Sequence, residues 1–163
     1  MIERTLIIIK PDAVRRQLIG EILGRFEKAC LKIIALKMVK PNDQTITQHY
    51  TEDIAKRRGA HVRQKLVNDF QGRPVVAGVI EGVGAVEVVR KLVGETEPHK
   101  ASPGTIRGDY GHYNFTYADT NNVALPNVIH ASANPEEAKR EIAIWFAPEE
   151  ILEYSSIHEL NHG

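Results

Sequence analysis

The sequence predicts an α/β (α+β) fold, a ferredoxin-like βαββαβ sandwich in which helices pack on a four-stranded antiparallel sheet. Apolar runs of strand length alternate with segments whose apolar residues recur every three or four positions, which is the period of a half-buried helix. The order of the strong segments is strand, helix, strand, helices, strand, helix, long loop, strand and helix. This order suits a ferredoxin-like sheet with its helices on one face.

The first strand and helix carry the clearest patterns. Residues 4–10 form an apolar run that ends at Pro11, as expected for a central strand buried on both faces. From Leu18 to Ala29 the apolar positions follow the helical period, so this segment is predicted to be an amphipathic helix. Lys32 to Val39 is expected to be the second strand.

The middle of the chain alternates weaker and stronger signals. Residues 43–58 carry weak helical patterns, whereas residues 60–70 place their apolar side chains on one helical face. Pro74 to Ile80 is a valine-rich segment typical of a strand. The segment Gly84 to Val93 then predicts a helix that ends near Gly94.

The last third of the chain is predicted to begin with a loop. Residues 95–126 contain proline, glycine and scattered aromatic residues without a period, and long loops in compact domains are commonly functional. Val128 and Ile129 form a short strand leading into His130. A helix follows from Asn134 to about Phe146, because a capping residue, a proline and a carboxylate stand in the order typical of a helix start.

Composition narrows the functional class. The 163 residues are 42% hydrophobic, enough for one domain over residues 1–163 without disulfides or metals. Basic and acidic residues both number 21, so the chain lacks the basic field that holds a nucleic acid. The apolar run 5–9 is too short to cross a membrane and lacks the features of a secretion signal, which favours a cytoplasmic protein. Cys30 is expected to be a small buried thiol at a helix end.

A histidine and a glutamate form the most informative pair. Glu141 lies three residues after Ala138 and four before Trp145 on the apolar stripe of the last helix, so its carboxylate should face inward. A buried carboxylate needs a partner. His130, just before this helix, would be held through one ring nitrogen and left with the other as a nucleophile. A salt bridge from Glu141 to a core lysine or arginine is an equally good interpretation of these residues alone.

Anion-binding groups occur in three further places. Lys10 ends the first strand, Arg90 lies on the helix before the loop, and residues 105–109 combine threonine, arginine and glycine within the loop. Cations that converge with glycines suit a phosphate. Neither the P-loop pattern nor the Rossmann glycine pattern occurs, so the phosphate site would be of another kind.

Several segments together resemble the nucleoside diphosphate kinase family over about residues 3–150. The similarity is carried by Thr5-Leu6-Ile7-Ile8-Ile9-Lys10-Pro11-Asp12-Ala13-Val14, Gly94-Glu95-Thr96-Glu97-Pro98, Pro103-Gly104-Thr105-Ile106-Arg107-Gly108-Asp109, Asn127-Val128-Ile129-His130-Ala131-Ser132 and the helix around Glu141-Ile142.

The resemblance implies a ping-pong transfer of the γ-phosphoryl group, typically from ATP, to a nucleoside diphosphate through phosphohistidine His130, with broad base specificity. It further implies that Glu141 orients His130, that Ser132 bonds Glu141 or positions the phosphoryl group, and that Mg²⁺ arrives on the nucleotide. A homo-oligomer, either a hexamer or a tetramer of a common dimer, is expected. The implied nucleotide contacts are Lys10 and Asn127 at the sugar, Tyr50 at the phosphoryl pocket, and Arg90, Thr96 and Arg107 at the phosphates.

The sequence departs from the family pattern in three places. Val62 aligns with the position where an aromatic ring usually stacks on the base, and His61 is a possible substitute. Residues 112–122 form an apparent insertion in a loop region that contributes to subunit contacts in the family. Ala133 stands where an acidic residue is common. After the last predicted helix, residues 147–163 are expected to form a C-terminal tail.

Three other functions have less support in the sequence. His158-Glu159-Leu160-Asn161-His162 fits the zinc-protease pattern, but it lies at the chain end, where helices fray, and no third ligand is indicated. An RNA-binding module is disfavoured, because its strands would carry aromatic clusters and the net charge here is zero. A regulatory relay that passes the phosphoryl group from His130 to another protein's histidine remains open as a second activity.

Overall fold

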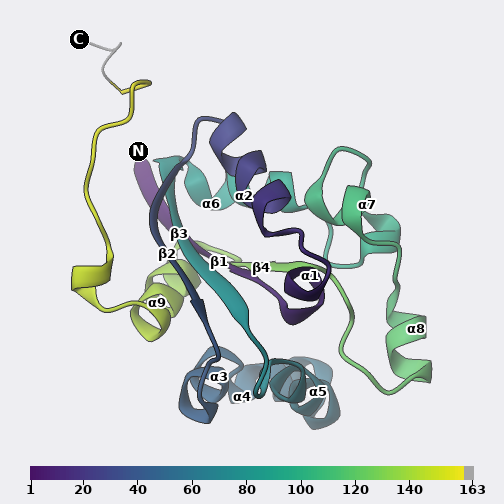
Figure 1. Ribbon diagram of the computed structural model, residues 1–163. Helices are drawn as coiled ribbons and strands as arrows, with labels where there is room; N and C mark the ends of the chain where they lie inside the picture. Colours follow the sequence, from purple (N-terminus) through teal and green to yellow (C-terminus); the bar gives the residue numbers. More distant parts are fainter. Residues whose placement is uncertain (160–163) are drawn as a thin grey trace.

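The computed structural model describes residues 1–159 and contains the predicted four-stranded sheet (Figure 1). The strands are β1 (Ile2–Ile9), β2 (Lys32–Val39), β3 (Val75–Val83) and β4 (Ile129–Ala131). They lie in the order β2-β3-β1-β4, and every neighbouring pair is antiparallel. The predicted fold class is therefore confirmed.

Helices cover both faces of the sheet, so the expectation that they share one face is wrong (Figure 1). In β1, Leu6 and Ile8 are buried on one face, while Ile7 and Ile9 are buried on the other. A central strand of this kind needs apolar cover on both sides. One face is covered by α2 (Ile19–Lys28) and α6 (Ala85–Val93), and the other by α3 (Asp43–His49), α5 (Ala60–Phe70) and α9 (Pro135–Trp145).

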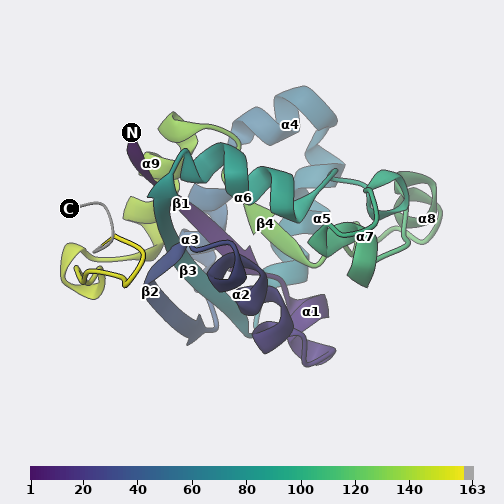
Figure 2. The ribbon, with the colours of Figure 1, turned by 90° about the horizontal axis from the view of Figure 1, so that it is seen from above.

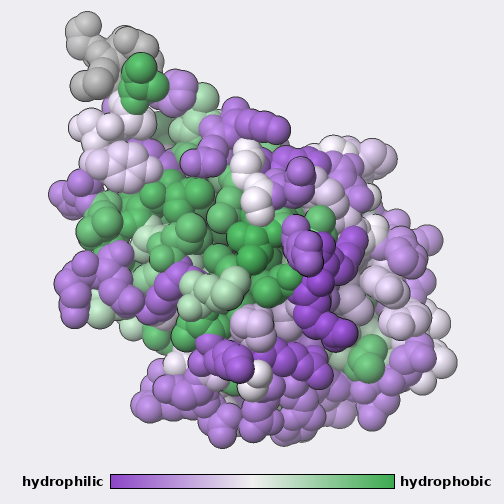
Figure 3. Space-filling view, in the orientation of Figure 1, coloured by the Kyte–Doolittle hydropathy of each residue, from purple (hydrophilic) through white to green (hydrophobic). Residues whose placement is uncertain are grey.

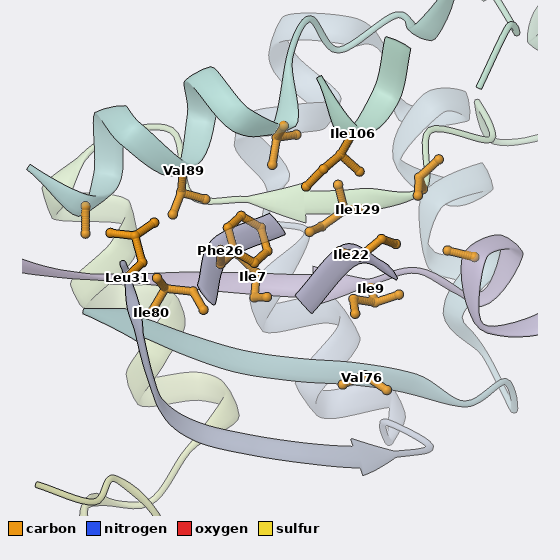
Figure 4. Close-up of a cluster of buried hydrophobic side chains, with 14 residues drawn as sticks. Ile7, Ile9, Ile22, Phe26, Leu31, Val76, Ile80, Val89, Ile106 and Ile129 are labelled. Atoms are coloured by element: carbon orange, nitrogen blue, oxygen red, sulfur yellow. The ribbon is translucent and has the colours of Figure 1, made fainter. Parts of the chain in front are cut away.

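Figure 4 shows the first of these two cores, in which Ile22 and Phe26 of α2 and Val89 of α6 meet isoleucines of the sheet. These side chains are fully buried, and each contributes roughly 1.5–3 kcal/mol through removal from water. The core therefore fixes β1 and β4. Lys10 directly follows the end of β1, and His130 lies on β4.

Residues 95–126 contain short helices, so the prediction of one long unstructured loop is wrong. They include the 3₁₀ helix η1 (Pro98–Lys100), α7 (Ile106–Tyr110) and α8 (Phe115–Thr120). The Thr105 hydroxyl accepts from the Gly108 N–H to cap α7, and the Asn114 side chain accepts from the Tyr117 N–H to cap α8. Helices of about one turn are too short to show a periodic pattern, which explains the error.

Three further short helices complete the described part of the chain: α1 (Pro11–Arg15), α4 (Glu52–Arg58) and η2 (Pro148–Glu150). Cys30 is exposed rather than buried, because α2 ends at Lys28 and the chain turns through a left-handed residue with φ 61° at Cys30. Among residues 1–159, no helix is both long enough and apolar enough to span a bilayer.

The chain after α9 runs back along β2. The Leu152 N–H donates to the Ile34 carbonyl at 2.8 Å, and the Tyr154 hydroxyl donates to the Ile33 carbonyl at 3.0 Å. Figure 2 shows this segment at the opposite end of the molecule from α7 and α8. His158 belongs to it, whereas His162 lies outside the described residues, so the histidine pair of the zinc-protease pattern is not described as a whole.

Candidate active site

A pocket of about 960 Å³ lies between α4 and α5 on one side and α8 with the segment before β4 on the other. Nine of the residues singled out in the sequence line it: Lys10, Tyr50, Val62, Arg90, Thr96, Arg107, Asn127, His130 and Glu141. Ser132, the tenth, is fully buried behind Glu141. Segments that are far apart in sequence thus meet at one site.

His130 lies on β4 and is 22% exposed, with Ile8 of β1 as its partner in the sheet. Its Nε2 is 2.9 Å from Oε2 of Glu141. Because a carboxylate only accepts hydrogen bonds, Nε2 carries the proton and Nδ1 keeps its lone pair. The nitrogen available for nucleophilic chemistry is therefore Nδ1.

Glu141 is 2% exposed and is held by two donors, His130 and the Ser132 hydroxyl, the latter at 2.5 Å. Burial alone would raise the pKa of Glu141, but the hydrogen bonds that it accepts from His130 and Ser132 outweigh burial and lower the pKa to about 2. Arg140 comes only within 3.7 Å of Oε1. Of the two interpretations left open by the sequence, the structure favours the histidine–glutamate pair.

Val128, the residue before β4, has a strained backbone conformation that sets the direction of this strand. Val128 has φ 72°, a left-handed conformation that is unfavourable for a β-branched side chain. Its N–H donates to the Asp12 carboxylate at 3.2 Å, and its carbonyl accepts from the Lys10 N–H at 2.9 Å. The turn after β1 therefore holds the bend that presents Asn127 and His130 to the pocket, and backbone strain of this kind is commonly found at functional sites.

His49, which the sequence analysis did not select, belongs to this cluster. It is 2% exposed, and its ring centroid lies 4.5 Å from that of His130 in an edge-to-face arrangement. Its Nδ1 accepts from Nε1 of Trp145 at 3.2 Å, while its buried Nε2 has no hydrogen-bond partner within residues 1–159. Burial, with a smaller contribution from His130, lowers the pKa of His49 to about 3, so this ring is neutral.

Lys10 and Asn127 form a buried link between three segments of the pocket wall. Lys10 Nζ donates to the Asn127 side-chain oxygen at 2.9 Å and to the Leu125 carbonyl at 3.2 Å. Asn127 in turn donates to the Thr96 carbonyl at 3.0 Å. Burial lowers the pKa of Lys10, and the nearby Asp69 carboxylate partly offsets this effect. The ammonium group is thus positioned before any ligand arrives.

Arg107 is 9% exposed and donates to three backbone carbonyls: Gly94 at 3.1 Å, Asn127 at 3.1 Å and Ile129 at 2.6 Å. Burial, together with the nearby Arg90, lowers the pKa of Arg107 to about 10, which leaves the guanidinium charged. Arg90 is exposed on α6 and lines the same wall. The two arginines and Lys10 make this wall suitable for a polyanion such as a triphosphate chain.

Tyr50 and Val62 lie at different depths. Tyr50 is buried against Phe70, with ring centroids 5.3 Å apart, and burial raises the pKa of its hydroxyl well above the ordinary value, so the hydroxyl stays protonated. Val62 is half-buried on α5, farther along the pocket. The structure therefore brings together all ten sequence-predicted residues, of which Ser132 contacts Glu141 and does not line the pocket.

Comparisons with known proteins agree with this arrangement. The family model described as nucleoside diphosphate kinase matches residues 3–151. The nucleoside diphosphate kinase of Borreliella burgdorferi is 45% identical, with 99% of this chain and 98% of that protein covered. The enzyme of Pyrococcus furiosus is 50% identical, with 94% and 88% covered.

Solved structures show the same similarity. One is a transition-state mimic of the nucleoside-diphosphate kinase from Borrelia burgdorferi with bound vanadate and ADP. It has a TM-score of 0.96 and 46% identity, with 99% of this chain and 96% of that chain covered. An NDP kinase from Pyrobaculum aerophilum gives a TM-score of 0.86 at 40% identity, with 94% and 100% covered. With its pocket, its histidine–glutamate pair and these matches, the chain belongs to the nucleoside diphosphate kinase family.

Proposed function

We propose that this protein transfers the γ-phosphoryl group of a nucleoside triphosphate, typically ATP, to a nucleoside diphosphate through a phosphohistidine at His130. The observation that carries the proposal is the contact between His130 Nε2 and the buried Glu141 carboxylate. This contact leaves Nδ1 free in a pocket that Lys10, Arg90 and Arg107 also line. Aliphatic side chains such as Val62 and Leu66 also line the pocket, and this supports broad base specificity, because an apolar contact does not select one base.

The reaction has two in-line steps. His130 Nδ1 attacks the γ-phosphorus, a nitrogen–phosphorus bond forms, and the bond from that phosphorus to the bridging oxygen breaks, which releases the diphosphate. A terminal oxygen of a second nucleoside diphosphate then attacks the phosphohistidine, and the nitrogen–phosphorus bond breaks. Glu141 accepts the hydrogen bond from Nε2 and stabilises the positive charge that the ring gains in the first step.

The remaining side chains have separate roles in this proposal. Arg90, Thr96 and Arg107 bind phosphate oxygens, and Lys10 with Asn127 contacts the sugar and its hydroxyl groups. The support is their position on one wall and the prior link between Lys10 and Asn127. Tyr50 lines the phosphoryl end as a neutral hydroxyl, and Ser132 is a positioning residue that fixes Glu141.

Magnesium would enter on the nucleotide. The cluster of potential metal ligands found among residues 1–159 is His49, His130 and Glu141, and in it Glu141 is already bonded to His130 and Ser132. These residues do not form an all-protein magnesium site, because Mg²⁺ prefers oxygen ligands and keeps several waters. Carried by the nucleotide, the ion would neutralise charge on the triphosphate.

We further propose that residues 1–163 form one domain and that the protein is a homo-oligomer, a hexamer or tetramer of a common dimer. The support is β2, an edge strand on which Leu36 and Met38 are 49% and 60% exposed. Figure 3 shows a broad hydrophobic area on the face where β2 runs in Figure 1. Exposed edge strands and large apolar areas mark interfaces between chains. A cytoplasmic location stays a prediction of the sequence.

The proposed function is tested by intact mass after brief exposure to ATP and Mg²⁺, quenched at alkaline pH because phosphohistidine is acid-labile. The wild type should gain one phosphoryl group and lose it to added GDP, whereas His130→Ala should gain none. If the wild type binds nucleotide but gains no mass, or if His130→Ala gains the same mass, the proposal is wrong.

A further inference from the structure

We infer that Phe115, on the inserted helix α8, is the aromatic ring that packs against the base of the bound nucleotide. The inference rests on the proposed function, because the orientation of the nucleotide follows from it. The γ-phosphoryl group must reach His130 at the inner end of the pocket, and the phosphates must lie along the wall formed by Arg90, Thr96 and Arg107. The base is then directed to the opposite, outer end.

The outer end is formed by two elements that face each other. Val62 and Leu66 of α5 line one side, and Phe115 and Ala118 of α8 line the other. Figures 1 and 2 both show α8 at the same end of the molecule as α7. Of the helices α3, α4 and α5, α5 lies nearest to α8 in both views. Apolar side chains thus line both sides of the space between these elements, and the charged side chains of Arg58, Lys65 and Asp119 line it as well. The apolar surfaces suit the faces of a flat base.

Phe115 is the best placed of the aromatic rings that line the pocket within the described residues. Tyr50 is buried and packed on Phe70 at the inner end. The His61 imidazole lies against Gly59, so close that a methyl group at Gly59 would come within 2.8 Å of the ring. The ring of Phe115, by contrast, is 39% exposed at the pocket wall, where a ligand would cover it.

The contacts of α8 support the same assignment. The Arg58 guanidinium carbon lies over the Phe115 ring, 5.6 Å from its centroid, so a planar group already fits on that face. Lys65 Nζ of α5 lies 3.5 Å from the Asp119 carboxylate of α8. These two contacts hold the inserted helix next to α4 and α5. Binding of a base would exchange the exposed guanidinium for the base on the face of Phe115.

The insertion thus supplies what α5 lacks at Val62. An aliphatic side chain covers one side of the base, and a ring from a different element covers the other. Because an aromatic ring stacks on any base, this arrangement favours nucleotide affinity without selecting one base.

The test measures the dissociation constant for ADP and, separately, for inorganic triphosphate, which occupies only the phosphate end. Phe115→Ala should weaken ADP binding about 5- to 100-fold and leave triphosphate binding unchanged, and Phe115→Trp should restore ADP binding. Tyr117→Ala is the matched control, because Tyr117 is 43% exposed on the same helix and is not among the pocket-lining residues.

The inference is overturned if Phe115→Ala binds ADP as tightly as Tyr117→Ala, or if it loses affinity for ADP and triphosphate equally. The second result would mean that Phe115 only supports the local fold. A failure of the proposed function looks different, since the wild type itself would then gain no phosphoryl group from ATP.

Discussion

Side chains at the two ends of the pocket differ in how much freedom the fold leaves them. At the inner end, Glu141 is 2% exposed and bonded to both His130 and Ser132. At the outer end, Phe115 is 39% exposed, and α8 is held by a cation–ring contact and by an ion pair whose Asp119 is 68% exposed. Bond making needs atoms fixed within fractions of an ångström, whereas covering a base needs only apolar area.

The comparison predicts that changes at the inner end reduce the rate of transfer, while changes at the outer end reduce nucleotide affinity. A substrate group that reacts must meet Nδ1 of His130 in one geometry. A base that packs on a ring can shift without losing much contact. The predictions below run from the largest expected effect to the smallest.

His130→Ala should lower the rate of phosphoryl transfer by at least about 10⁴-fold, because no other side chain replaces the nucleophile. A coupled assay of GTP formation from ATP and GDP measures this effect. ADP affinity is the control, and it should change by no more than about threefold, since Lys10, Arg90 and Arg107 are unchanged in this variant. A variant that keeps one tenth of the wild-type rate would show that the nucleophile lies elsewhere.

His49→Gln should flatten the dependence of stability on pH. The folded-state pKa of His49 is about 3, against an ordinary value of 6.5, so between these values the unfolded chain binds a proton that the folded chain does not. The contribution of neutral His49 is complete above pH 6.5 and is lost as pH falls toward 3. From pH 6.5 to about pH 4 the loss is about 3 kcal/mol.

Urea unfolding at fixed protein concentration measures this effect in both proteins. The wild type should lose more free energy of unfolding than His49→Gln over this range, because glutamine does not titrate and its amide oxygen still accepts from Trp145. Parallel curves for the two proteins would mean that His49 titrates normally in the folded state.

Glu141→Gln should lower kcat about 10- to 100-fold, the range found when a group that orients a reactive ligand is removed. Glutamine can still accept a hydrogen bond from His130, but it carries no charge to stabilise the ring. Glu141 is hydrogen-bonded to His130 and Ser132 and makes no hydrogen bond to Lys10, Arg90 or Arg107, so KM for ATP should hardly change. An unchanged kcat with a raised KM would assign Glu141 to nucleotide binding instead.

Asp119→Asn should have the smallest effect, a change of about 1 kcal/mol or less in the free energy of ADP binding. The Lys65–Asp119 pair is 3.5 Å long and Asp119 is 68% exposed, so solvent and salt screen the attraction. Titration of ADP at low and high salt measures the effect. A loss larger than that of Phe115→Ala would show that the ion pair, and not the ring, closes the outer end.

The sequence was most informative where a side chain's surroundings follow from local periodicity. The burial of β1 on both faces follows from its continuous apolar run, and the inward position of Glu141 on α9 follows from the spacing of neighbouring apolar residues. The pairing of Glu141 with His130 was one of two interpretations that the residues alone allowed, because the cost of an unpaired buried carboxylate requires a partner without naming it, and the contact between the two side chains decides between them.

Features set by contacts between distant elements could not be predicted in this way. His49 ends a short helix without a clear period, and its place beside His130 depends on how α3 packs against α9. The position of α8 depends on the contacts of Phe115 and Asp119 with α4 and α5, which are distant in the sequence. Cys30 was misplaced because the left-handed turn after α2 carries no glycine to signal it.

The central claim is that the inner end of the pocket controls the rate and the outer end controls the affinity. Single-turnover phosphorylation by ATP, measured over a range of ATP concentrations, separates the maximal rate from the dissociation constant. Ser132→Ala should lower the maximal rate with little change in the dissociation constant, and Phe115→Leu should do the reverse. If both variants change the same quantity, the two ends do not act separately and the account is wrong.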